Sequence, residues 1–161
     1  MNELNEQLET GCCPRFNPES WDEKVITLDD RLFVKDHVCK FFHIPLTFSK
    51  AMIRNIIKIE RADARADEMI VLSECKSLWK DNLYISVSKE VPGARMATVP
   101  GTFMTKVFEG PYRNAGKWAK EMTTYVESKG KQIKTIYFFY TTCPKCAKVY
   151  GENYTVLLAG I

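Results

Sequence analysis

The sequence lacks any run of apolar residues that approaches the roughly 18 needed to cross a membrane as a helix. It also lacks a dense cluster of lysine and arginine, and its formal net charge is only +3, so it has no electrostatic signature of nucleic-acid binding. The segment Met1–Thr10 is acidic and polar and does not resemble a signal peptide. These absences predict a cytoplasmic protein with no membrane and no nucleic-acid partner, and they leave the oligomeric state open.

Several signatures of well-known enzymes are absent as well. The chain contains no Gly-x-Ser-x-Gly motif, no zinc metalloprotease motif and no phosphate-binding loop. A helix-turn-helix pattern is missing too, and the length leaves no room for one, which argues against a DNA-binding regulator. A free-standing binding domain or a small enzyme is therefore favoured.

What the 161 residues do supply is enough for one domain, or for two half-size modules that share a core. Hydrophobic residues make up 45% of the chain and aromatic residues 12%, which is sufficient for a packed interior. We interpret residues 1–22 as an N-terminal arm that carries Cys12-Cys13 and ends where Trp21 docks. A single domain over residues 23–161 follows it.

Two apolar stripes predict amphipathic helices, one over residues 47–62 and one over residues 112–128. Lys129-Gly130 ends the second helix, because glycine tolerates the left-handed conformation found there. The stripes consist of Phe48, Met52, Ile56 and Ile59 in the first helix and of Ala115, Trp118, Met122 and Tyr125 in the second.

Strand patterns surround these helices, and the order strand–helix–strand–strand occurs twice, in modules at about 32–90 and 101–161. This order predicts an α+β fold in which two pseudo-symmetric modules form a curved, mostly antiparallel sheet with two main helices. The predicted strands lie near residues 38–44, 69–75, 83–87, 102–108, 133–140 and 154–161.

The motif Phe108–Tyr112, with the sequence Phe-Glu-Gly-Pro-Tyr before an amphipathic helix, resembles the GyrI-like small-molecule-binding family. The doubled module resembles the fold of that family over residues 30–161. Three further stretches, Gly11–Phe16, Phe42–Leu46 and Cys143–Cys146, resemble a stand-alone bacterial branch described as hydrolases. The resemblance implies a ligand groove where the modules meet, and some similar proteins hydrolyse strained-ring natural products.

Aromatic residues on the strands and on the second helix are the candidates to line such a groove. Aromatic side chains offer a large apolar contact area, and tyrosine and tryptophan add a polar group. For each candidate, a place in the core is an equally good interpretation. No acidic residue occurs in Ile133–Tyr140, so a hydrophobic or aromatic ligand is favoured over a cation. The candidates are Tyr84, Tyr112, Trp118, Tyr137 and Phe139.

Acid–base chemistry has two candidates, Glu109 and His43. Glu109 lies at a strand end just before a helix, where the helix dipole favours a charged carboxylate that could serve as a base or contact a cation. His43 could move a proton near neutral pH. A surface glutamate and a partly buried histidine are the alternatives, because the sequence does not show that the two residues meet.

Four cysteines form the last candidate site. Cys12, Cys13, Cys143 and Cys146 could hold a structural zinc ion that ties the arm to the second hairpin, with no open position for catalysis. A redox Cys-x-x-Cys is less favoured, because no helix follows Cys146. Free thiols are the remaining alternative. Small-molecule binding, hydrolysis of an electrophilic molecule and a zinc-stapled interaction module are thus the three functions that the sequence leaves open.

Overall fold

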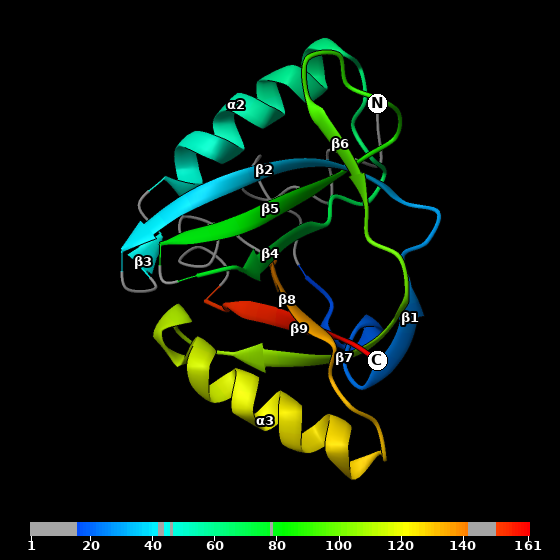
Figure 1. Ribbon diagram of the computed structural model, residues 1–161, viewed down its shortest axis with the longest axis vertical. Coiled ribbons are helices and arrows are strands. Elements are labelled where there is room, and N and C mark those ends of the chain that lie inside the picture. The colour runs from blue at the N-terminus through cyan, green and yellow to red at the C-terminus, as the bar shows by residue number, and fades with distance from the viewer. Residues whose placement is uncertain (1–15, 42–43, 46, 78, 142–150) are drawn as a thin grey trace. The chain divides into compact units, whose positions relative to one another are not determined.

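The computed structural model describes residues 16–41, 44–45, 47–77, 79–141 and 151–161. The chain divides into two compact units. One unit is Thr27–Thr102, and the other combines the N-terminal residues up to Ile26 with Phe103–Ile161. Within the described residues each unit has its own strands and one α-helix, which confirms the α+β fold (Figure 1).

The Thr27–Thr102 unit has β5 between β4 and β2, and both pairings are antiparallel. Ile85 of β5 lies opposite Val34 of β2 on one side and Val71 of β4 on the other. The second edge of β2 carries two short strands, β6 near one end and β3 near the other. The elements are β2 (Leu32–Phe41), β3 (Ile44–Pro45), α2 (Phe48–Arg61), β4 (Val71–Cys75), β5 (Lys80–Val87) and β6 (Arg95–Thr98).

The other unit repeats this arrangement, with β9 antiparallel to both β7 and β8 and with β1 beside β7. The first module is β2–α2–β4–β5, and β5 lies between β2 and β4 in its sheet. The second module is β7–α3–β8–β9, and β9 lies between β7 and β8 in the same way. The predicted doubling of the strand–helix–strand–strand module is therefore confirmed. The elements are the 3-10 helix η1 (Pro18–Ser20), β1 (Lys24–Thr27), β7 (Thr102–Glu109), the 3-10 helix η2 (Tyr112–Asn114), α3 (Ala115–Ser128), β8 (Thr135–Tyr140) and β9 (Tyr154–Gly160).

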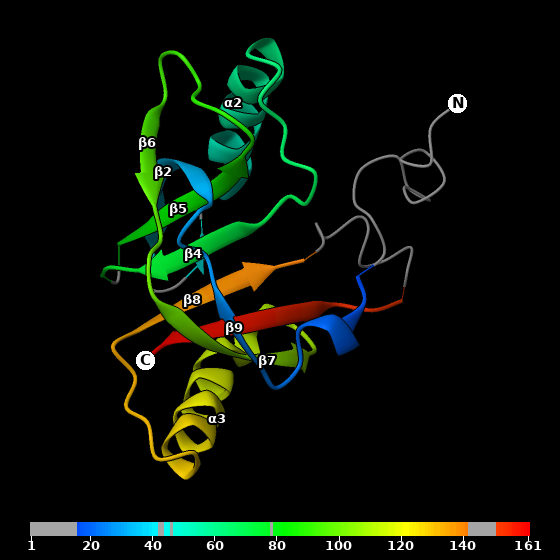
Figure 2. The same ribbon diagram turned by 90° about the vertical axis from the view of Figure 1, so that its right-hand side faces the viewer.

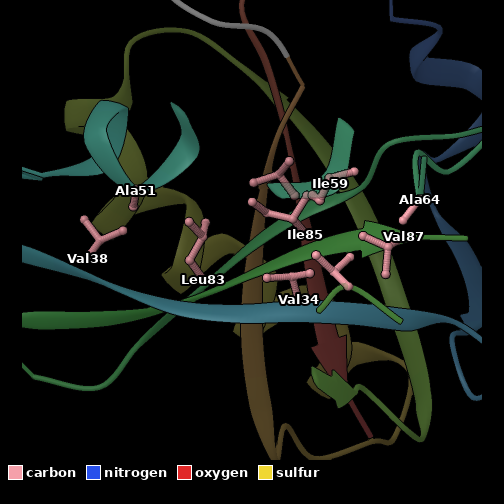
Figure 3. Close-up of a cluster of buried hydrophobic side chains, with 10 residues drawn as sticks. Val34, Val38, Ala51, Ile59, Ala64, Leu83, Ile85 and Val87 are labelled. Atoms are coloured by element: carbon pink, nitrogen blue, oxygen red, sulfur yellow. The ribbon is translucent and has the colours of Figure 1, made fainter. Parts of the chain in front are cut away.

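The core of the Thr27–Thr102 unit lies between α2 and one face of its sheet (Figure 3). Successive side chains of a strand point to opposite faces, so Val34 and Val38 of β2 face the helix together. Ile59 of α2 is buried against them, and Phe48 and Met52 pack at the margin, as their spacing predicts. Ala51, Ala64, Val71, Leu83, Ile85, Val87 and Val91 complete the buried cluster.

The second core lies between α3 and one face of the β7–β9–β8 sheet (Figure 2). Trp118, Met122 and Val126 are buried there, and Ala115 and Tyr125 are partly buried beside them. This is the apolar stripe that the sequence predicts. Gly130, with φ +73°, takes the left-handed conformation that ends the helix.

The sequence pattern underestimates the β-structure around residues 91–101. No strand is predicted between those near residues 83–87 and 102–108, yet Arg95–Thr98 forms β6 and pairs with β2. The strand predicted near residues 38–44 also begins earlier, at Leu32. In the part of the chain that the structure describes, no helix combines the length and apolar character needed to span a bilayer.

Candidate functional site

Aromatic side chains cover the face of the β7–β9–β8 sheet that α3 does not cover. Ile136 and Phe138 of β8 belong to the α3 core, so the alternation along the strand places Tyr137 and Phe139 on the opposite face. The ring of Tyr137 meets that of Phe103 edge to face, with centroids 5.8 Å apart. The structure thus settles which residues of β8 share a face with Phe103.

The N-terminal segment adds further rings to this face. Trp21 lies with its ring centroid 5.3 Å from that of Phe139, which confirms its expected docking. Phe16 lies 6.3 Å from Phe139 and 5.8 Å from Tyr154, centre to centre. Together these rings form what we call the aromatic row, which consists of Phe16, Trp21, Phe103, Tyr137, Phe139 and Tyr154.

Hydrogen bonds fasten the N-terminal segment over the row. The hydroxyl of Thr105, a fully buried residue of β7, donates to the backbone carbonyl of Trp21. The backbone N–H of Val107 donates to Asp22 Oδ1 at 3.0 Å. Because these bonds join the segment to β7, the cover of the row belongs to the same unit as the row.

Glu109 stands at one end of the aromatic row. It lies directly opposite Tyr154 in the β7–β9 register, and its side chain is exposed. Burial raises the pKa of the Tyr154 hydroxyl, and the negative charges of Glu152 and Glu109 raise it further. Tyr154 therefore stays protonated at neutral pH, and an acidic side chain is available beside the row.

The turn after Glu109 explains the Phe-Glu-Gly-Pro-Tyr motif. Gly110 has φ +133°, a conformation that strongly favours glycine. Its N–H donates to the Asn153 carbonyl at 3.1 Å, and its own carbonyl accepts from Asn153 Nδ2 at 2.8 Å. Phe108 stacks on Trp118, with centroids 5.8 Å apart. The motif therefore fixes where β7 ends and where Glu109 is presented.

The structure separates the aromatic residues that the sequence groups as ligand-binding. Tyr137 and Phe139 belong to the aromatic row. Trp118 lies in the α3 core, and Tyr112 packs edge to face on Tyr140, with centroids 4.9 Å apart. Since Tyr140 follows the alternation of Ile136 and Phe138, these contacts lie on the α3 face of the sheet.

Tyr84 belongs to the Thr27–Thr102 unit, on the face of β5 that α2 does not cover. It is 7% exposed and meets Phe33 edge to face, with centroids 6.4 Å apart. Lys35 Nζ lies 5.6 Å from the centre of the tyrosine ring, within cation–π range. The helix-free face of each unit is thus aromatic. A ligand groove between the modules stays a prediction.

Five predicted site residues lie outside the described residues: His43, Cys12, Cys13, Cys143 and Cys146. Two other cysteines, Cys39 and Cys75, are exposed free thiols. Sequence reasoning missed Phe103, Phe16 and Tyr154 as members of the row. The alternation of Phe103 with Met104 along β7 was the available signal, because Met104 packs on α3.

Comparisons with known proteins agree with this description. The profile of a family described as bacterial hydrolase matches residues 3–161. No curated protein matches the chain. The EcmrR C-terminal domain is similar in structure, with a TM-score of 0.65 and 10% identity over 87% of this chain and 96% of that one. SAV2435 bound to tetraphenylphosphonium gives a TM-score of 0.53 and 11% identity over 85% and 92%. At these identities the similarity establishes the fold, and it confirms the resemblance to the GyrI-like fold.

Proposed function

The chain belongs to the bacterial hydrolase family, and from that premise and its fold we propose that it binds a small hydrophobic or aromatic molecule through the aromatic row. The observation that carries the proposal is the row itself, in which four rings lie on the helix-free face of one sheet and the rings of Phe16 and Trp21 lie over them. The similar structure of SAV2435 supports it, because that protein is bound to tetraphenylphosphonium, a cation surrounded by phenyl rings.

Access to the row requires movement of its cover. Phe139 is 6% exposed and Tyr137 9%, and the rings of Trp21 and Phe16 lie on Phe139. These two rings belong to a short segment around η1 (Pro18–Ser20) rather than to the sheet. We propose that a ligand displaces them and takes over their contacts with Phe139. Each aromatic contact contributes about 0.5–1.5 kcal/mol beyond its buried area. Because the ligand exchanges its contacts for those of Trp21 and Phe16, the net affinity comes mainly from burial of the ligand's own apolar surface.

A calorimetric titration with two probes of the same shape tests this function. Tetraphenylphosphonium and tetraphenylborate both present phenyl rings but carry opposite charges. If aromatic contact dominates, both probes bind saturably with one site per chain, and both raise the melting temperature. Failure of both probes to bind would overturn the proposal.

Hydrolysis of an electrophilic small molecule is the second candidate, which the description of the family favours. Glu109 is exposed at the end of the row beside the protonated Tyr154. A carboxylate there can take a proton from a water molecule that attacks a bound electrophile, while a tyrosine hydroxyl donates a hydrogen bond. Product formation from strained-ring electrophiles, abolished in Glu109→Gln, would establish turnover. Binding without product leaves the chain a binding protein.

A structural zinc ion bound by Cys12, Cys13, Cys143 and Cys146 also stays a proposal. Four thiolates suit tetrahedral zinc, and such a site would tie the N-terminal arm to the second hairpin. Metal analysis of protein purified without chelator tests it directly. One zinc ion per chain supports the site, and a metal-free protein argues against it. The cytoplasmic location and the absence of membrane or nucleic-acid partners likewise stay predictions.

A further inference from the structure

A polar concavity of about 460 Å³ lies within the Thr27–Thr102 unit. It is lined by β2, by α2, by the start of β5 and by the segment that enters β6. Next to it, residues 36–39 of β2 lie between the part of the strand that pairs with β6 and the part that pairs with β3. Its cationic side chains define what we call the basic notch: Lys35, Arg54, Lys58, Lys80 and Arg95.

The carboxylate of Asp36 is the one acidic side chain among the described residues that line the notch. Arg54 Nε and Asn55 Nδ2 each donate to Asp36 Oδ2 at 2.7 Å, and the N–H of His37 donates to Oδ1 at 2.8 Å. Partial burial raises the pKa of Asp36, but these hydrogen bonds outweigh it and lower the pKa to about 2. Asp36 is therefore ionised and already committed to Arg54.

The other four cations of the notch have no carboxylate partner within the described residues. Lys58 Nζ donates to the Gly93 carbonyl at 3.2 Å, and Lys35 Nζ faces the Tyr84 ring. Lys80 and Arg95 are exposed, and neither forms an ion pair with the part of the chain described here. Like charges within a Debye length repel one another, so a bound anion would remove an unfavourable interaction.

The two asparagine amides of the notch already form hydrogen bonds. The Asn55 amide nitrogen donates both to Asp36 Oδ2 and to the Ala51 carbonyl, each at 2.7 Å. Asn82 Nδ2 donates to Glu74 Oε1 at 3.1 Å. Apart from the ring of His37, the side chains left to recognise a ligand are therefore cationic, which favours an anion over a neutral polar molecule such as a sugar.

We propose that the basic notch binds a small, multiply charged anion of the phosphate-bearing class. Its volume falls within the roughly 300–1,000 Å³ typical of small-molecule sites. Arg95 supplies the planar donor fork that suits phosphate oxygens, and Lys58 and Lys80 supply point charges. The notch shares no residue with the aromatic row, so this site is independent of the function proposed above.

Calorimetric titration of the full chain with inorganic pyrophosphate at constant ionic strength tests the notch. Binding is expected to be saturable, with one site per chain. Arg95→Glu and Lys80→Glu each remove one unpartnered cation, so each is expected to weaken binding roughly tenfold or more. Lys120→Glu makes the same charge change on the exposed face of α3 in the other unit and is expected to change affinity less than about twofold.

Two outcomes of the pyrophosphate titration would overturn the proposal. One is the absence of saturable pyrophosphate binding. The other is an equal loss of affinity in all three variants, which would mean attraction to overall charge rather than a site. Titration with DNA duplexes of increasing length tests whether the notch instead belongs to a nucleic-acid surface. DNA binding that strengthens with length and displaces pyrophosphate would make the notch part of a nucleic-acid surface and would contradict a small-molecule site. Lys80→Glu is expected to keep its affinity for the phenyl probes. The proposal for the notch and the function proposed for the aromatic row can therefore be tested separately.

Discussion

The indole ring of Trp21 and the phenyl ring of Phe139 meet edge to face, with their centroids 5.3 Å apart. This contact joins the N-terminal segment to the face of β8 that α3 does not cover. It also keeps Phe139 at 6% exposure. The same pair of rings therefore links the stability of the unit to ligand access, because binding on the aromatic row must break the contact.

Replacement of Thr105 by valine tests how the cover is held. Thr105 is fully buried, and its hydroxyl donates to the Trp21 carbonyl. Valine keeps the shape of the side chain but leaves that carbonyl unpaired, so we expect the free energy of unfolding to fall by about 1–3 kcal/mol. Urea unfolding of the wild type and of Thr105→Val at neutral pH measures this difference.

Thr123→Val is the matched control for Thr105→Val. The Thr123 hydroxyl donates at 2.9 Å to the Ala119 carbonyl, one turn back within α3. Losing this local bond is expected to cost no more than about 0.5 kcal/mol. Equal costs for the two valine variants would mean that the bond to Trp21 does not anchor the segment.

Breaking the buried ion pair between Lys40 and Asp81 is expected to lower the free energy of unfolding more than Thr105→Val does. The Lys40 side chain is 3% exposed, and its Nζ lies 2.5 Å from Asp81 Oδ1 and 3.0 Å from Cys75 Sγ. Burial lowers the pKa of Lys40, but the bonds to Asp81 and Cys75 outweigh it and raise the pKa. Asp81→Asn would leave a buried ammonium group without its counter-charge, so we expect a loss of about 3–5 kcal/mol in urea unfolding.

Glu60→Gln removes the same charge from an exposed pair and serves as the control. Glu60 and Arg65 are 60% and 57% exposed and lie 3.7 Å apart. An exposed pair of this kind contributes at most about 1 kcal/mol. If Asp81→Asn and Glu60→Gln destabilised the protein equally, the Lys40 site would not behave as a buried charge.

The lowered pKa of Asp36 predicts that part of the folding stability is lost at acidic pH. Its pKa is about 2 in the folded chain against an ordinary 3.8, so the folded state holds the ionised form more tightly. This stabilisation is complete above about pH 5 and is lost as the pH falls toward 2, by about 1–2 kcal/mol. Asp36→Asn cannot titrate there. We expect the wild type to lose that much more unfolding free energy than Asp36→Asn between pH 6 and pH 2.5, and parallel curves would contradict the assignment.

Much of the fold follows from residue spacing. Trp118, Met122 and Val126 repeat with the helical period, and the structure buries them together. The same spacing explains why Trp118 lies in the core, since the stripe that predicts an amphipathic helix also turns its residues toward the sheet. The strand β6 was not predicted, because it is short and because its partner, β2, is distant in sequence.

The sites were harder to predict, because they depend on which elements pack together. Alternation puts Tyr137 and Phe139 on one face of β8, but only the contact of Phe138 with the α3 core shows which face it is. The basic notch gives no local signal, because its cations lie on β2, α2, β5 and β6. Lys35 and Arg95 are paired only through the register of β2 with β6.

Glu109→Gln tests the part of binding that depends on charge. Glu109 is exposed at the end of the row, so its attraction for a cation is expected to contribute at most about 1 kcal/mol. We expect this variant to weaken binding of the phosphonium probe by up to about fivefold and to leave borate binding the same or slightly tighter. An equal loss for both probes would mean that Glu109 acts by shaping the turn at Gly110 rather than by its charge.

Binding of the phenyl probes to Phe139→Leu and Phe138→Leu tests the aromatic row most directly. The two residues are neighbours on β8, but Phe139 contacts Trp21 on the row and Phe138 packs on the α3 core. We expect Phe139→Leu to weaken binding of both probes by about fivefold or more, while Phe138→Leu changes affinity less than about twofold at a similar cost in stability. Equal losses in the two variants, or a loss confined to Phe138→Leu, would contradict a ligand site on the aromatic row.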